Sequence, residues 1–317
     1  GLLVIVDMHC HLSHKDFYPD IYWELIAQSL SLNLGISKEK VLRDMMPEFW
    51  KKDASTIVED MDKAGVDKAV IMPVDFELKV GKAKMSIEEQ NRYHARAADE
   101  YPDRLIAFVG VDPRRGDKAV ELLEKGVTEW GMKGLKFHPD AGYYPNDPVC
   151  FPLYKKCVEL GVPLLCHCGL IFIPFEVKYN NPMYLDDVQT AFPDLRIVAA
   201  HMGGISGAPT LAEIGSLKSG IHTEISFTGQ MLARGAPQIL LNNLRMLMDL
   251  PLTFAVPFKN RILFGSDWPY ANSMMKLEEW VNWIKNLPKN GKRYGLKFSG
   301  EETRLILGEN AKKILKI

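Results

Sequence analysis

The sequence has no long hydrophobic run and no excess of charge of either sign. Its apolar N-terminal stretch, Leu2 to Val6, ends at Asp7, whereas a membrane-spanning helix needs about 20 apolar residues and a secretory signal needs an apolar core of roughly 7–15. We therefore expect no membrane span and a cytoplasmic protein. The 39 Lys and Arg residues balance 40 Asp and Glu residues, so bulk charge gives no general attraction to nucleic acid or anionic lipid. The expected ligand is a small molecule.

Cysteine is also scarce. Five cysteines, an odd number, in 317 residues without a secretory signal predict buried thiols rather than a disulfide framework. Hydrophobic residues make up 47% of the chain and charged residues 25%, which excludes a disordered protein and allows a sizeable core.

Short apolar runs alternate with amphipathic stretches of helical length along the whole chain. Several of the amphipathic stretches end at a glycine suited to a helix C-cap, as at Gly65, Gly131 and Gly161. Apolar runs that do not alternate with polar residues are typical of a parallel sheet buried on both faces. We therefore predict one α/β domain over residues 1–317, a (β/α)8 TIM barrel. The eight predicted strands are Leu2–His11, Lys68–Val74, Leu105–Pro113, Gly134–Pro139, Pro163–Gly169, Arg196–Gly203, Gly220–Phe227 and Arg261–Pro269.

Two segments exceed what a minimal barrel needs. Residues 12–54, between the first and second strands, are rich in aromatic residues. We expect this segment to form an inserted cap over the barrel mouth. Residues 228–260 follow the seventh strand. Ordinary helix packing explains their apolar side chains, and a subunit contact in a homodimer is the alternative.

The first predicted strand ends in Asp7-Met8-His9-Cys10-His11. Strict alternation along a strand would place Asp7, His9 and His11 on one face and Met8 and Cys10 on the other. Two imidazoles on one face, about 6.5 Å apart by strand rise, can reach the same ion.

Three more strands end in a side chain that could bind a metal. The fifth ends at His167, the sixth at His201 and the eighth at Asp267. A barrel gathers the carboxyl ends of its strands at one mouth, and such a buried cluster is costly without a cation. Cys166 and Cys168 flank His167 and should point away from it as packing residues, although a Cys-x-Cys zinc pair is an alternative.

Alternation on the fourth strand directs Lys136 and His138 into the barrel. One interpretation is that they bind a substrate carboxylate or phenolate. Lys136 could instead be carboxylated and bridge two metals, or pair with an interior acid such as Glu224. Trp268, beside Asp267, could form a wall of the substrate pocket or could simply be packed.

Taken together, these motifs resemble the amidohydrolase superfamily, in particular the branch related to aminocarboxymuconate semialdehyde decarboxylase, often called amidohydrolase family 2. The resemblance extends over nearly the whole chain and rests on Asp7-Met8-His9-Cys10-His11, Tyr101-Pro102-Asp103-Arg104, Val111-Asp112-Pro113, Gly134-Leu135-Lys136-Phe137-His138-Pro139, His167, Ala200-His201-Met202-Gly203-Gly204, Gly265-Ser266-Asp267-Trp268-Pro269 and Leu307-Gly308-Glu309-Asn310-Ala311.

The resemblance implies a barrel with one divalent ion held by His9, His11, His167 and Asp267, with His201 as a catalytic group beside the metal-bound water. In other branches the histidine equivalent to His201 is itself a ligand. Three imidazoles and a carboxylate suit Zn²⁺ first, with Mn²⁺, Fe²⁺ or Co²⁺ as alternatives.

The leading functional hypothesis is a metal-dependent hydrolase that acts on a C–N or C–O bond of a small, carboxylated substrate. Asp267 would accept the water proton and His201 would hold the nucleophile or stabilise the oxyanion. The runner-up is a nonoxidative decarboxylase of an aromatic or muconate-type acid. A third hypothesis is a barrel that binds a ligand without turnover. The presence of all five polar residues at the strand ends argues against it: His9, His11, His167, His201 and Asp267.

Overall fold

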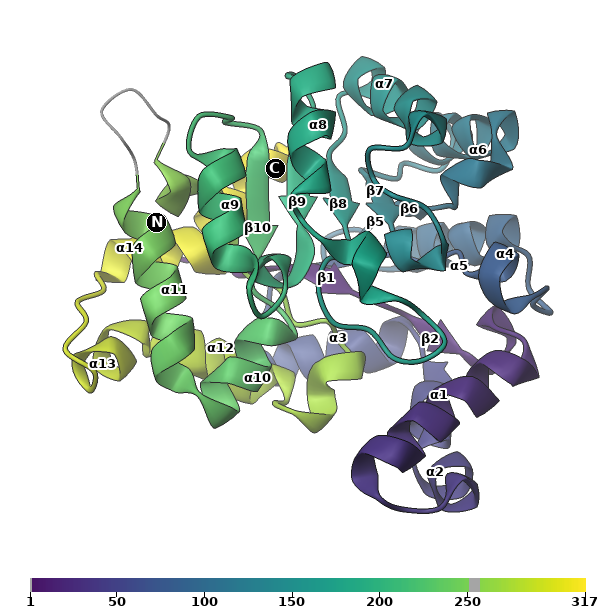
Figure 1. Ribbon diagram of the computed structural model, residues 1–317, viewed down its shortest axis with the longest axis horizontal. Helices are drawn as coiled ribbons and strands as arrows, with labels where there is room; N and C mark the ends of the chain where they lie inside the picture. Colours follow the sequence, from purple (N-terminus) through teal and green to yellow (C-terminus); the bar gives the residue numbers. More distant parts are fainter. Residues whose placement is uncertain (1, 251–256) are drawn as a thin grey trace.

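The computed structural model describes residues 2–250 and 257–317, and its centre is a closed parallel barrel (Figure 1). Each predicted strand contains an observed one, and the third is interrupted at Phe108 into two short strands. The strands are β1 (Val6–Cys10), β4 (Lys68–Ile71), β5 (Leu105–Ala107) with β6 (Val109–Gly110), β7 (Leu135–Phe137), β8 (Leu164–Cys166), β9 (Ile197–Ala199), β10 (Ile221–Glu224) and β11 (Ile262–Leu263).

Backbone hydrogen bonds close the ring. The strands pair in the orders β1-β4-β5 and β11-β10-β9-β8-β7-β6. Phe108 N–H donates to Ile71 O at 2.9 Å, and Met8 N–H donates to Phe264 O at 2.9 Å. A parallel bridge between Cys10 and Trp268 extends the contact of β1 with the segment after β11. The predicted (β/α)8 barrel is confirmed.

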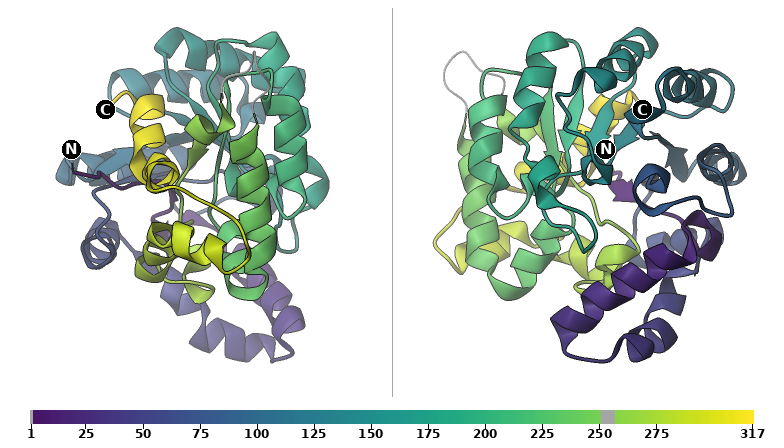
Figure 2. Two further views of the ribbon diagram at one scale, coloured as in Figure 1. Left: turned by 90° about the vertical axis from the view of Figure 1, so that its left-hand side faces the viewer. Right: turned by 45° about the vertical axis from the view of Figure 1, so that its right-hand side comes forward.

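Helices surround the barrel and connect its strands (Figure 2). Their ends follow local sequence signals, such as the Ser86–Glu89 capping box before α5 and the left-handed Gly65 and Gly161 after α3 and α7. The helices are α3 (Ala54–Ala64), α4 (Glu77–Val80), α5 (Ile87–Glu100), α6 (Asp117–Thr128), α7 (Phe151–Leu160), α8 (Tyr184–Ala191), α9 (Gly207–Gly215), α10 (Thr228–Gly235), α11 (Pro237–Asp249), α12 (Leu277–Lys285), α13 (Leu287–Lys292), α14 (Gly300–Arg304) and α15 (Asn310–Leu315).

The core has two parts. Side chains on the outer face of the strands pack against the helices, whereas a smaller cluster fills the barrel interior. Ile314 and Leu315 of α15 belong to the interior cluster. Between α14 and α15 the chain forms a π-helical turn, η10 (Leu305–Glu309), whose Ile306 carbonyl accepts Phe264 N–H. The tail therefore packs against one end of the barrel, and the other end remains for the site.

The segment between β1 and β4 is built mainly of two helices, which stand apart from the ring of helices (purple in Figure 1). It contains β2 (Ser13–His14), η1 (Lys15–Phe17), α1 (Asp20–Leu34), α2 (Lys38–Asp44), η2 (Met46–Phe49) and β3 (Lys51–Lys52). Tyr22 of α1 reaches the barrel loops, where its ring lies 6.1 Å from that of Phe76 and 6.4 Å from that of Phe175. The insertion thus contacts the loops after β4 and β8.

In the described residues no helix combines the length and the apolar character that a bilayer span requires.

The second segment that exceeds a minimal barrel, residues 228–260, is built of helices. It contains α10, α11 and the start of η8 (Phe258–Arg261), and Leu240 and Leu244 of α11 are buried in the outer core. Residues 251–256 of this segment lie outside the described residues.

Candidate metal centre

Side chains from the two ends of the chain meet inside the barrel. His9 Nε2 lies 3.0 Å from His11 Nε2. Asp267, shortly after β11, places Oδ1 3.2 Å from His11 Nε2 and 3.5 Å from His9 Nε2. All three residues are buried. The structure therefore brings together three of the four predicted ligands.

A β-bulge in β1 directs the two histidines inward. Asp7 lies opposite Ala69 and Cys10 lies opposite Ile71, so β1 has one more residue between these two pairs than β4 has. A bulge of this kind changes which face the following side chains occupy. Met8 packs in the barrel interior, whereas Asp7 accepts hydrogen bonds from Ser266 N–H and Oγ–H outside the His9–His11 group. The predicted common face of Asp7, His9 and His11 is therefore wrong for Asp7, and Met8 does not face outward.

Hydrogen bonds fix which nitrogen of each imidazole carries the proton. His9 Nδ1 lies 2.8 Å from Glu224 Oε1, and His11 Nδ1 lies 2.9 Å from the Met72 carbonyl oxygen. Both partners are acceptors, so each Nδ1 donates and each Nε2 presents a lone pair. Burial lowers the pKa of both imidazoles, which favours these neutral forms. Two lone pairs and a carboxylate therefore converge, and this donor set fits a divalent cation.

Asp267 is suited to remain ionised in this cluster. Burial acts to raise the pKa of its carboxyl, but the contact with His11 and the neighbouring Lys136 ammonium group outweigh that effect and hold the pKa below its usual value. The backbone of Asp267 has φ 52°, in the left-handed region that non-glycine residues seldom adopt. Strained backbone of this kind is concentrated at functional sites.

Lys136 faces the same point, as alternation on β7 predicts. Its Nζ donates to His9 Nε2 at 2.9 Å, and its side chain is buried. Burial lowers the pKa of this ammonium group to about 8, although Asp267 and Glu224 act in the opposite direction. Lys136 is thus a buried cation beside the predicted ligands.

His167 lies beside the His9–His11–Asp267 group and not within it. Its Nε2 is 3.6 Å from Asp140 Oδ2, and its ring stacks on that of His138 with centroids 4.0 Å apart. Nδ1 of His138 is 2.5 Å from Asp140 Oδ1. His167 Nε2 is buried and forms no hydrogen bond within the described part of the chain. An orphaned buried imidazole nitrogen is expected of a metal ligand, and its ring also lies 5.0 Å from that of His201.

His201 stacks directly on the predicted ligand His9, with ring centroids 4.8 Å apart. It lies in η7 (Ala200–Gly203), where His201 and Met202 have φ 58° and 57°. Its Nδ1 lies 2.9 Å from Ser226 Oγ, and burial lowers the pKa of the ring to about 4. The side chain is thus held beside the centre in its neutral form.

Trp268 does not reach the centre. Its side chain is fully buried in the outer core, and its indole N–H donates to Asp60 of α3 at 3.0 Å. This orientation toward the helices favours the alternative that the ring of Trp268 is simply packed, and its role in substrate binding stays a prediction. The neighbouring Tyr270 lies closer, with its ring 5.4 Å from that of His11.

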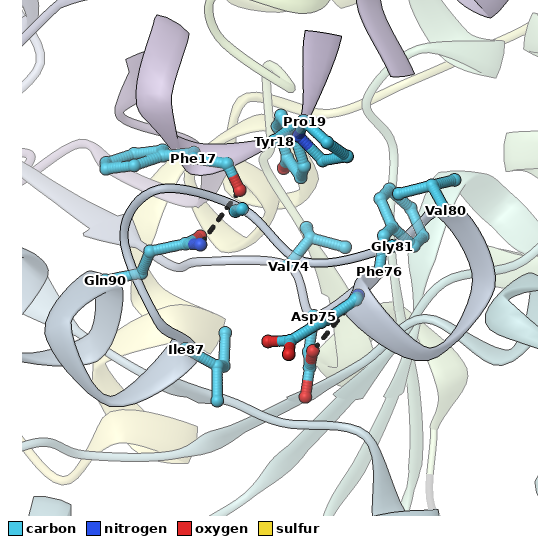
Figure 3. A pocket seen from close by; sticks show the side chains of 12 residues that line it. Phe17, Tyr18, Pro19, Val74, Asp75, Phe76, Val80, Gly81, Ile87 and Gln90 are labelled. Carbon is cyan, nitrogen blue, oxygen red and sulfur yellow. Dashed lines mark hydrogen bonds between the residues drawn. The ribbon is translucent and has the colours of Figure 1, made fainter. Parts of the chain in front are cut away.

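Aromatic side chains cover the side of the centre near His138. Phe76 meets the His138 ring edge to face at 4.7 Å and packs against Phe175 at 4.3 Å. Next to this cover, Figure 3 shows a pocket between η1 and the segment before α5. Its volume of about 10 Å³ is room for about one water molecule, so it is too small for a substrate.

Sequence reasoning missed the acids that orient the histidines. Asp140 contacts His138, and Glu224 contacts His9. The weak signals available were the position of Asp140 two residues after His138 and the position of Glu224 near a strand end. From the sequence, Glu224 is only a possible partner of Lys136, and the structure instead places its carboxylate against His9 Nδ1.

A family model described as "Amidohydrolase" matches residues 6–317. The chain belongs to the amidohydrolase family. The family match extends from the start of β1 to the end of the described chain, so it includes every side chain of the centre.

Individual relatives are distant. The 2-amino-3-carboxymuconate-6-semialdehyde decarboxylase of Dictyostelium discoideum is 21% identical over 234 residues, which are 63% of this chain and 63% of that protein. The match therefore spans less than two thirds of the relative's own length.

Two solved structures share the fold over almost their full length. A 5-carboxyvanillate decarboxylase from Novosphingobium aromaticivorans, complexed with manganese and 4-hydroxy-3-methoxy-5-nitrobenzoic acid, has a TM-score of 0.69 at 17% identity and covers 99% of this chain and 96% of its own. A probable 2-pyrone-4,6-dicarboxylic acid hydrolase from Acinetobacter baumannii has a TM-score of 0.64 at 16% identity, with 99% of both chains covered.

Proposed function

We propose that this amidohydrolase binds one divalent ion through His9, His11 and Asp267, with His167 as the fourth ligand. The converging lone pairs of the first two residues and the unsatisfied Nε2 of His167 support this set. Zn²⁺ suits three imidazoles and a carboxylate, and Mn²⁺, which the related decarboxylase structure contains, is the principal alternative.

The reaction that we propose is nonoxidative decarboxylation of a small, planar, unsaturated carboxylic acid. The observation that carries this proposal is a buried cation next to an aromatic cover: Lys136 lies inside the centre, and Phe76 and Phe175 cover the neighbouring His138. A conjugated ring packs well against such a cover. Two of the three relatives described above are decarboxylases, which favours this reaction over the hydrolysis that the sequence alone placed first.

In this proposal a bound divalent ion supplies Lewis acidity toward the oxygens of the substrate. The Lys136 ammonium group pairs with a substrate carboxylate or phenolate and orients it. As the C–C bond to the carboxylate breaks, its electron pair passes into the conjugated system and carbon dioxide leaves. The carbon then takes up a proton that comes from water through His201, whose neutral ring, held at Nδ1 by Ser226, accepts a proton at Nε2 and passes it on. The buried surroundings keep water from the charged groups.

Hydrolysis is the second candidate. His201 and Asp267 lie at the centre as the pair needed to activate water, and one fold relative is a probable pyrone-dicarboxylate hydrolase. In that reaction Asp267 would accept the water proton.

Product analysis separates the two. The zinc- or manganese-loaded protein should be incubated with hydroxybenzoates, muconate-type acids, carboxylated lactones and amides, with carbon dioxide detection and the His201→Asn variant as the control. Release of one carbon dioxide for each molecule of unsaturated acid consumed supports decarboxylation. Ring opening of a lactone without carbon dioxide supports hydrolysis instead, and no turnover of either class by the loaded protein contradicts both.

A further inference from the structure

We propose that Glu224 is a positioning residue that sets the proton positions of two histidines, His9 directly and His201 through Ser226. This inference rests on the proposed function only in taking His9 as a metal ligand. It does not depend on which bond the enzyme breaks.

The first connection runs to His9. Glu224, the last residue of β10, is fully buried, and its Oε1 accepts the proton of His9 Nδ1 at 2.8 Å. Because a carboxylate only accepts hydrogen bonds, it holds His9 in the tautomer whose Nε2 lone pair faces His11 and Asp267. Carboxylate–histidine pairs of this kind also make the imidazole a stronger ligand.

The second connection passes through a hydroxyl group. Ser226 Oγ lies 2.9 Å from Glu224 Oε1 and 2.9 Å from His201 Nδ1. The serine can donate its one proton to the carboxylate and then must accept from His201, so Nδ1 of His201 carries the proton. The Ser226 carbonyl oxygen, 3.2 Å from the same Nδ1, also only accepts. His201 therefore presents an unprotonated Nε2, like His9.

Glu224 also anchors the backbone of both segments. Oε1 accepts His201 N–H at 2.9 Å and Oε2 accepts Ser226 N–H at 2.8 Å. The first of these bonds holds His201 in its left-handed conformation. Burial raises the pKa of the Glu224 carboxyl to about 7, and the four donors that converge on it oppose that effect and favour its ionised form.

Gly265 provides the space for this carboxylate. A Cβ atom at this position would lie 2.1 Å from Glu224 Oε2 and 3.3 Å from His9 Cβ. A side chain there would displace Glu224 without changing its charge. This gives a steric test that is independent of replacing the acid.

The experiment compares three variants with the wild type. Zinc affinity is measured by competition with a chromogenic chelator, and histidine tautomers by long-range ¹H–¹⁵N spectra of protein labelled at its eight histidines. Glu224→Gln presents an amide N–H₂ group or a weaker acceptor to His9. We expect zinc affinity to fall 10–100-fold and His9 to lose its uniform Nδ1–H tautomer.

The other two variants separate the two connections. Ser226→Ala should leave zinc affinity within about twofold and make the tautomer of His201 alone less uniform, because its Nδ1 then keeps only the longer bond to the backbone carbonyl of residue 226. Gly265→Ala should weaken zinc binding as Glu224→Gln does. Thr223→Val is the control, since its hydroxyl lies on the same strand but donates to Ala199 O. It should lower the melting temperature without changing zinc affinity.

Unchanged zinc affinity and an unchanged His9 tautomer in Glu224→Gln and Gly265→Ala would overturn the inference. If Glu224→Gln does not fold, Gly265→Ala decides by the same two measurements. A wild-type protein that binds no divalent ion is a different result, because it contradicts the proposed metal centre itself.

Discussion

The ammonium nitrogen of Lys136 lies 2.9 Å from His9 Nε2, on the lone pair that we assign to the metal ion. A lysine at this place can either bind the substrate or, as a carbamate, bridge two metals. The direct contact of its Nζ with a single imidazole nitrogen favours a lysine that is not carboxylated and that shares the site with one ion.

We therefore expect Lys136→Met to keep about one metal per chain and mainly to raise KM. A lost charge-assisted contact to a substrate carboxylate weakens binding by roughly 1.5–3 kcal/mol. Metal analysis and steady-state kinetics check this, and bicarbonate should have no effect. Two metals in the wild type, an added carbon dioxide in its intact mass, and joint loss of metal and activity in the variant would establish the carbamate instead.

The His9 and His11 lone pairs face each other at 3.0 Å, so replacing both by Ala removes the part of the donor set that most needs a cation. We expect the double variant to lose the divalent ion that the wild type carries, as measured by elemental analysis after gel filtration. His14→Ala/His222→Ala is the matched control, because neither histidine belongs to a candidate ligand group of the described chain. Stoichiometric metal in His9→Ala/His11→Ala would contradict the ligand assignment.

The fold and the meeting of the strand ends follow from the sequence, because a parallel barrel fixes which ends of its strands lie together. His9, His11 and Asp267 converge for this reason although more than 250 residues separate Asp267 from the two histidines. Lys136 faces inward because β7 is regular.

Predictions that depend on strict alternation failed where a strand is irregular. The bulge after Asp7 reverses the expected faces of Asp7 and Met8. The position of Trp268 next to Asp267 is the only reason to expect it in the pocket, and its ring instead points toward α3, as alternation from an inward-facing Asp267 would place it. Asp140 and Glu224 could not be assigned because their roles depend on contacts with His138 and His9, which are set by tertiary structure.

His201 stacks on His9 and lies outside the His9–His11–Asp267 group, although His9, His201 and Glu224 form a second potential ligand group in which Ser226 and Glu224 hold His201 by Nδ1. We therefore expect His201→Asn to keep most of the metal and to lose activity by roughly two to four orders of magnitude, the range for acid–base and oxyanion groups. Parallel measurements of metal content and kcat test both parts. A metal-free variant would make His201 a direct ligand.

The last prediction concerns stability in acid and a histidine of helix α5. His94 is fully buried, and its Nδ1 donates to the Gln90 carbonyl oxygen at 2.8 Å. Its Nε2 is buried without a hydrogen-bond partner in the described residues. Burial lowers the pKa of His94 from 6.5 to about 3, although the Gln90 bond acts to raise it.

Between these two pKa values the unfolded chain binds a proton that the folded protein does not, so the free energy of unfolding falls as the pH falls from 6.5 toward 3. At pH 5 the loss from this one group is about 2 kcal/mol. His94→Gln cannot titrate, and its free energy of unfolding should therefore decrease less between pH 7 and pH 5 than that of the wild type, by urea denaturation at each pH. His14→Gln, which changes a partly exposed histidine, is the control and should follow the wild type. Equal pH dependence of wild type and His94→Gln would show that His94 is not neutral in the folded protein at pH 5.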